Sequence, residues 1–192
     1  LMKDMDKAVE RIDRAVKTGE KIMVYGDYDV DGCTAVALVY TFLRSRGHQN
    51  LTFYIPDRYT EGYGISIPSI DYAERKGVSL VIALDCGIKA VEKIAYANSK
   101  AIDVIVCDHH TPGDELPAAV AVLNMKRHDC PYPYKDLSGC GVGFKLAQAY
   151  TQRYLASHLS PNSLIALLPL TQLLAMSIAS DIVPITGENR IL

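Results

Sequence analysis

The chain has 192 residues, of which 49% are hydrophobic and 22% are charged. This composition is typical of one globular domain or a compact pair, and it excludes a disordered or collagen-like chain. The 20 lysines and arginines and the 22 aspartates and glutamates leave a formal net charge of −2, which excludes a protein that binds nucleic acid through an overall positive field. A polyanion would have to bind at a local site, through metal ions, or with help from other parts of a longer protein.

The amino-terminal half reads as alternating helices and strands. Apolar residues spaced three and four apart predict an amphipathic helix over Met5–Gly19. Strands are predicted at Lys21–Tyr25 and Leu51–Ile55, and between them an acidic loop leads into a helix over Thr34–Arg46. A further helix is expected near Ile70–Lys76.

The carboxyl-terminal half continues this pattern. Leu80–Leu84 and Val104–Cys107 are short runs that are apolar throughout, which indicates strands buried on both faces of a parallel sheet. The remaining predicted elements are a helix over Lys89–Ser99, a short strand over Val120–Leu123, and helices over Val142–Ala156 and Asn162–Ala179. We therefore predict an α/β fold with an open, mostly parallel five-stranded sheet flanked by helices.

The cysteines favour a reduced, cytoplasmic setting. There are five of them and no two form a Cys-x-x-Cys pair, whereas secreted disulfide scaffolds carry an even, patterned set. The longest apolar stretch, residues 164–179, is interrupted by Pro169 and is shorter than the ~20 residues that a bilayer span needs. We expect no membrane segment.

Acidic residues follow three of the predicted strands. The first strand runs into Asp27 and Asp29, the third into Asp85, and the fourth into Asp108 with two histidines behind it. A single such aspartate is most often a helix cap. Because the carboxyl ends of parallel strands meet at one edge, however, these carboxylates would repel one another unless a cation compensated them.

The residue types indicate which cation. Carboxylates with the imidazoles of His109 and His110 suit Mn²⁺ or a similar ion better than Ca²⁺, and so many potential ligands suggest two ions. Two metals ~3.5–4 Å apart are the usual arrangement for displacement at phosphorus. An EF-hand calcium loop starting at Asp27 is excluded, because its twelfth position would be Leu38 and an apolar strand precedes it.

Two roles are open for each of several neighbouring residues. Asp31 either orients its loop or caps the next helix. Arg58 would suit a substrate phosphate, with Tyr59 or Tyr63 stacking on a base, or it is a solvated loop residue. Lys145 follows a glycine-rich segment and either faces a phosphate or lies on a packed helix. The basic run at residues 126–128 is interpreted as surface, with phosphate contact as the alternative.

Four segments together resemble the motifs of the DHH phosphoesterase superfamily, and the resemblance covers nearly the whole chain. They are Gly-Asp-Tyr-Asp-Val-Asp-Gly at 26–32, Asp85, Asp-His-His at 108–110 and Ala-Ser-Asp-Ile-Val-Pro at 179–184. The segments Pro-Asp-Arg…Glu-Gly-Tyr-Gly at 56–64 and Ser-Gly-Cys-Gly-Val-Gly-Phe-Lys at 138–145 are similar to those of its RecJ branch, the 5′→3′ exonucleases specific for single-stranded DNA.

The resemblance implies a role for each matching residue. His110 would contact the scissile phosphate, Asp108 would fix an imidazole, and Arg58 and Lys145 remain candidates for phosphate contact. Asp85 would bridge the two metals, Mn²⁺ or Mg²⁺, and take part in catalysis. The implied metal ligands are Asp27, Asp29, Asp85, His109 and Asp181.

The resemblance also implies a wider setting. Residues 1–192 would be the catalytic core of a longer chain, without the DHH-associated and OB-fold domains. The expected activity is hydrolysis of single-stranded DNA to 5′-mononucleotides in repair and recombination, with a single-strand-binding protein and a helicase as candidate partners. Two alternatives stay open: a phosphodiesterase for oligonucleotides, cyclic dinucleotides or bisphosphorylated nucleotides, and a non-catalytic scaffold.

Overall fold

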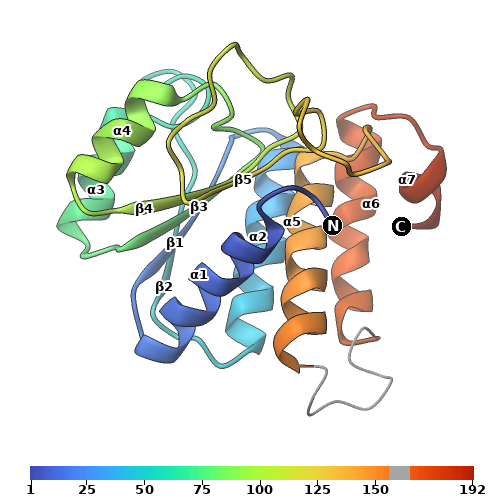
Figure 1. The fold of residues 1–192 in the computed structure, drawn as a ribbon, viewed down its shortest axis with the longest axis horizontal. Helices are drawn as coiled ribbons and strands as arrows, with labels where there is room; N and C mark the ends of the chain where they lie inside the picture. The colour runs from blue at the N-terminus through green and yellow to red at the C-terminus, as the bar shows by residue number, and fades with distance from the viewer. Residues whose placement is uncertain (156–164) are drawn as a thin grey trace.

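The computed structural model describes residues 1–155 and 165–192 (Figure 1). Its centre is a sheet of five parallel strands in the order β2-β1-β3-β4-β5, which confirms the predicted fold class. The strands are β1 (Ile22–Gly26), β2 (Leu51–Tyr54), β3 (Leu80–Leu84), β4 (Asp103–Cys107) and β5 (Ala121–Leu123). The α-helices are α1 (Met5–Thr18), α2 (Val30–Ser45), α3 (Ile67–Arg75), α4 (Val91–Ser99), α5 (Gly139–Tyr150), α6 (Thr171–Ser180) and α7 (Gly187–Ile191).

Helices cover both faces of the sheet, as the apolar strands require. Alternate strand residues such as Val24 and Ile82 pack into a core shared with α1, α2, α5 and α6. Their neighbours Tyr25 and Ala83 point to the other face and pack under α3 and α4. Figure 1 shows these two layers, with α3 and α4 on one side of the strands and the larger helical group on the other.

The strand register brings the chain to one edge at several points. Gly26, Leu84, Cys107 and Leu123 lie side by side at the carboxyl ends of β1, β3, β4 and β5. The residues that follow them therefore leave the sheet together: Asp27, Asp85, Asp108 and Asn124. The order of the strands reverses between β1 and β3, and sheets of this kind bind ligands at that point.

Two glycines allow α2 to begin directly at this edge. A Cβ atom on Gly26 would collide with the Val36 side chain, and one on Gly32 would collide with the Asp27 backbone. Asp29 caps the helix, because its carboxylate accepts a hydrogen bond from the Gly32 amide at 2.9 Å. The helix therefore begins at Val30 rather than at the predicted Thr34.

Other element boundaries also differ from the predictions. The helix α5 begins at Gly139, three residues before the predicted start, and a π-helical turn over Thr151–Leu155 follows it. The predicted helix from Asn162 begins outside the described residues, and the described part contains a 3-10 helix over Ile165–Leu170 before α6. The short helix α7 was not predicted. Within the described residues, no helix is both long and apolar enough to cross a bilayer.

The interpretation of residues 126–128 as a surface cluster is wrong for its middle member. The Arg127 guanidinium is buried, and it pairs with Asp4 at 2.7 Å and with Asp129 at 2.8 Å. It also donates a hydrogen bond to the Val122 carbonyl oxygen. Arg127 therefore joins the amino-terminal segment to the end of β5.

Candidate metal centre

Three buried polar side chains converge where β1, β3 and β4 end. Asp27, Asp85 and His109 are 1%, 2% and 7% exposed. Four of their side-chain atoms have no hydrogen-bond partner: one oxygen of each aspartate and both ring nitrogens of His109. Buried polar atoms are normally paired, and carboxylate oxygens and imidazole nitrogens without a hydrogen bond are suited to hold a cation.

His109 stands at the centre of the group. Its Nε2 atom lies 3.2 Å from Asp85 Oδ1, 3.6 Å from Asp181 Oδ2 and 3.9 Å from Asp31 Oδ2. Asp181 reaches this position from the carboxyl end of α6. Two sets of potential ligand atoms, each within 4.8 Å of one another, meet at this histidine: Asp85, His109 and His110 in one, and Asp31, His109 and Asp181 in the other.

The electrostatics favour a bound cation. Burial raises the pKa of Asp85 to about 10, and the nearby charges of Asp31 and Asp29 add to the shift. Burial likewise raises the pKa values of Asp27 and Asp181. Divalent cations remove such a penalty, and a set of carboxylates with an imidazole suits Mn²⁺ or Mg²⁺. The residues present therefore fit a divalent metal site.

Asp29 occupies the exposed rim of the same group. One of its oxygens is used by the cap of α2, while its charge acts on both Asp27 and Asp85. Of the five predicted metal ligands, the structure brings Asp85, His109 and Asp181 within ligand distance through His109. Asp27 and Asp29 lie on the loop after β1, where the charge of Asp29 acts on Asp85.

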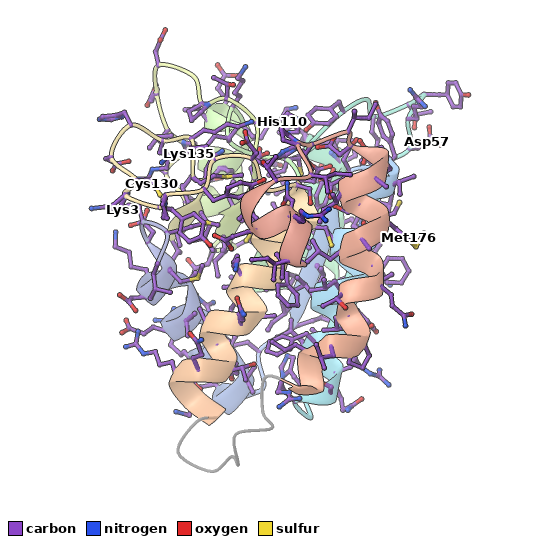
Figure 2. All side chains as sticks on the ribbon, turned by 90° about the vertical axis from the view of Figure 1, so that its right-hand side faces the viewer. Lys3, Asp57, His110, Cys130, Lys135 and Met176 are labelled. Atoms are coloured by element: carbon purple, nitrogen blue, oxygen red, sulfur yellow. The ribbon has the colours of Figure 1, made fainter. Side chains whose placement is uncertain are left out.

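His110 is held beside the metal centre by a separate set of contacts. Its Nδ1 atom lies 2.7 Å from Asp108 Oδ1, and the Tyr63 hydroxyl lies 3.2 Å from the same nitrogen. The hydrogen bond with Asp108 raises the pKa of His110. Burial opposes ionisation of Asp108, but its hydrogen bonds with His110 and Ile88 hold its pKa below the usual value. In Figure 2, His110 lies toward the upper end of the molecule, as does Asp57.

Asp31 has a structural role in which both of its oxygens are used. Oδ2 accepts a hydrogen bond from the Gly139 amide at 2.7 Å, and Oδ1 accepts bonds from the Cys140 amide at 2.8 Å and the Ser177 hydroxyl at 2.7 Å. The carboxylate therefore satisfies free amides at the start of α5 and ties α2 to α5 and α6.

The two predicted phosphate-binding residues have different surroundings. Arg58 is exposed, and its guanidinium lies 4.9 Å from the centre of the Tyr28 ring, beside the Asp27–Asp29 loop. Lys145 is half-buried on α5, where its amine pairs with Glu188 at 2.5 Å and with Gln148 at 3.3 Å. The structure therefore leaves Arg58 available near the metal centre and does not bring Lys145 into the group.

Sequence reasoning missed how Asp85 is supported. Its backbone is left-handed, with φ at 59°, a conformation that costs a non-glycine residue free energy. The Tyr63 hydroxyl donates a hydrogen bond to the Asp85 carbonyl at 2.8 Å, and a Cβ atom on Gly139 would lie 2.5 Å from that of Asp85. Asn124 was also missed. Its side-chain amide donates a hydrogen bond to the His110 carbonyl oxygen at 2.8 Å. The signal for Asn124 was its position directly after a strand.

Comparison with known proteins places these residues in a family. Residues 21–171 match the DHH family, N-terminal domain. The chain belongs to the DHH family. The matched range contains the ends of β1, β3 and β4, with their aspartates and both histidines, and it ends before Asp181.

Relatives in the DHH family include exonucleases. The chain is 41% identical over 191 residues to the single-stranded-DNA-specific exonuclease RecJ of Bacillus subtilis, and it is 39% identical to RecJ of Escherichia coli. These matches cover 100% and 98% of this chain, but only 23% and 33% of the relatives. The chain thus spans about a third or less of the length of either protein.

Solved structures of RecJ proteins superpose on this chain. An exonuclease RecJ bound to manganese superposes with a TM-score of 0.86 at 30% identity, over 100% of this chain and 46% of that one. RecJ of Thermus thermophilus superposes over 98% of this chain, with TM-scores of 0.79 in its Mn²⁺ complex, at 28% identity and 26% of that chain, and 0.63 in its Mg²⁺ complex, at 26% identity and 22% of that chain.

Proposed function

We propose that this chain is the catalytic core of a two-metal phosphodiester hydrolase that degrades single-stranded DNA from the 5′ end and releases 5′-mononucleotides. The observation that carries the proposal is the set of unpaired ligand atoms on Asp27, Asp85 and His109 at the point where the strand order reverses. The similarity to RecJ exonucleases over the whole chain supports single-stranded DNA as the substrate.

The metal ions would be held by the five residues that meet at the sheet edge. Carboxylate and imidazole ligands suit Mn²⁺ or Mg²⁺, the two ions present in solved RecJ structures. Such ions activate a water molecule and neutralise charge on the phosphate oxygens. The protein holds their ligands in place through the backbone contacts of Asp85 and through the α2 cap at Asp29.

His110 and Arg58 would act on the phosphate itself. The contact with Asp108 fixes one nitrogen of the His110 ring and favours its protonated form, so that the ring presents an N–H donor to a phosphate oxygen. The Arg58 guanidinium lies on the same rim and has no carboxylate partner among the described residues. It would donate hydrogen bonds to a phosphate of the approaching strand.

The cellular setting follows from the same proposal. We place the enzyme in the cytoplasm, where its five free cysteines would remain reduced. An enzyme that acts in DNA repair and recombination would require access to single-stranded DNA. Proteins that expose or coat those strands, a helicase and a single-strand-binding protein, are therefore the expected partners.

The direct test is digestion of 5′-phosphorylated single-stranded DNA by the intact protein in Mn²⁺, with chromatography to identify the products. We expect 5′-mononucleotides to appear first from the 5′ end, and we expect Asp85→Asn to lose at least ~10³-fold in rate. Asp114→Asn is the matched control, because Asp114 is an exposed carboxylate in the loop after β4. Faster turnover of a dinucleotide than of a long strand would instead favour a small-substrate phosphodiesterase.

A further inference from the structure

A cavity of about 230 Å³ opens beside His110, on the side of the sheet that carries α4. We call it the α4 pocket. His110, Asp108 and Tyr63 line it, and the Tyr63 hydroxyl also donates a hydrogen bond to the Asp85 carbonyl, which links the pocket to the metal centre. Its other lining residues are Gly64, Ile65, Gly87, Ile88, Lys89, Ala90 and Lys93. Lys89, Ala90 and Lys93 take no part in the metal centre, so the pocket extends the binding surface beyond that site.

The wall of the α4 pocket is largely apolar. Ile65 and Ile88 are 5% and 2% exposed and belong to the core under α3 and α4. Gly87 packs directly on this core, because a Cβ atom there would lie 3.3 Å from Ile65 Cδ1, and its φ of 106° disfavours a side chain. An apolar wall suits the sugar or base of a nucleotide. The volume lies below the ~300–1,000 Å³ of pockets for drug-sized ligands, so it suits a fragment of one nucleotide.

The rim of the pocket carries two lysines. Lys89 is exposed and Lys93 is half-buried, and within residues 1–155 and 165–192 neither has an ion-pair or hydrogen-bond partner. Asp108 does not neutralise them, because its oxygens are occupied by His110 and by the Ile88 amide. Two unpaired ammonium groups beside an apolar wall are complementary to a phosphate attached to a sugar and a base.

We propose that the α4 pocket binds the nucleotide next to the scissile phosphate. The sugar or base rests on Ile65, Ile88 and Ala90, and the phosphate of that nucleotide lies between Lys89 and Lys93. This inference depends on the proposed function, because a DNA phosphate at His110 is what brings the neighbouring nucleotide to the pocket. Lys89 and Lys93 are then specificity-determining residues that act on substrate binding and not on bond cleavage.

Two changes in the intact protein test the charge and the volume of the pocket separately. The double variant Lys89→Gln, Lys93→Gln removes the charges, and Ala90→Leu fills the space. The matched control is Lys76→Gln, which removes an exposed lysine at the carboxyl end of α3, on the opposite edge of the sheet. Thermal unfolding shows whether each variant is folded.

The substrate is a 5′-phosphorylated oligothymidylate in Mn²⁺ at several salt concentrations. For the double lysine variant we expect KM to rise about tenfold and kcat to stay within about twofold. The slope of log kcat/KM against log salt should fall by about 0.7, since the two lysines neutralise one phosphate of a single strand. For Ala90→Leu we expect a similar rise in KM with an unchanged salt slope.

Binding of thymidine 5′-monophosphate, measured by calorimetry, gives a second readout without turnover. We expect both pocket variants to weaken it about tenfold, while Lys76→Gln leaves it unchanged. Wild-type digestion of DNA together with unchanged KM, salt slope and mononucleotide affinity in the folded pocket variants would overturn the pocket proposal alone. If the wild type does not cut DNA at all, the proposed function fails, and the calorimetry still reports on the pocket.

Discussion

Replacing Asp85 by asparagine should stabilise the metal-free protein while abolishing its response to metal. The side chain is 2% exposed, its Oδ1 atom has no hydrogen-bond partner, and Asp31 and Asp29 lie nearby. Asparagine has the same shape and no charge, so the variant loses the repulsion and creates no cavity. If Asp85 is a metal ligand, as proposed, its carboxylate lowers the stability of the metal-free fold, as is common at active sites.

The magnitude follows from the pKa of Asp85, which burial raises from 3.8 to about 10. Between these two values the folded protein holds a proton on Asp85 that the unfolded chain has lost, so the stability of the metal-free wild type falls as pH rises, by up to ~1.4 kcal/mol per unit. Asp85→Asn lacks this loss. As pH rises from about 6 to 8, we expect the free energy of unfolding of the variant to increase by roughly 2–3 kcal/mol relative to that of the wild type.

Urea unfolding in EDTA at several pH values measures this difference, and the same experiment in Mn²⁺ measures the metal response. At free Mn²⁺ of about a hundred times its dissociation constant, the wild type should gain ~2.7 kcal/mol, and Asp85→Asn should gain little. If the two proteins showed parallel pH profiles in EDTA, or if Mn²⁺ stabilised both equally, the assignment of Asp85 as a buried metal ligand would be wrong.

Three further substitutions separate structural from catalytic roles. Asp31→Ala removes three buried hydrogen bonds and should cost about 4 kcal/mol in urea unfolding; an equal loss in EDTA and in Mn²⁺ would support a structural role. Arg127→Met should cost about 3 kcal/mol and leave the salt dependence of DNA cleavage unchanged; a shallower salt slope would mean that the arginine contacts DNA. Tyr63→Phe removes the bond to the Asp85 carbonyl and should lower kcat about tenfold with little change in KM; a wild-type kcat would exclude a positioning role.

Strand ends were the most predictable part of the site. Parallel strands buried on both faces appear in the sequence as continuous apolar runs, and the residue after each run must leave at the carboxyl edge. Asp27, Asp85 and Asp108 could be located in this way without any knowledge of the helices. Asp181 was accessible only through the family resemblance, because the path of α6 across the molecule depends on packing against α2 and α5.

The errors come from contacts that link distant parts of the chain. Lys145 was considered for phosphate contact because it follows a glycine-rich segment at the start of a predicted helix, where free amides can face an anion. The helix starts at Gly139, so Lys145 is six residues, or ~9 Å, along the axis. The buried position of Arg127 depends on Asp4, 123 residues away, and a local basic run contains no information about that partner.

The overall charge of −2 is compatible with DNA as substrate because opposite charges are segregated at the sheet edge. Asp27, Asp85 and their neighbours form a buried acidic group that requires cations. Lys89 and Lys93 lie on the adjacent rim without partners among the described residues. With two dications bound, the metal centre would no longer repel a phosphate, and the unpaired lysines would attract the next one along the strand. The net charge of the chain therefore does not predict whether it binds a polyanion, since binding depends on how the charges are distributed over this one edge of the sheet.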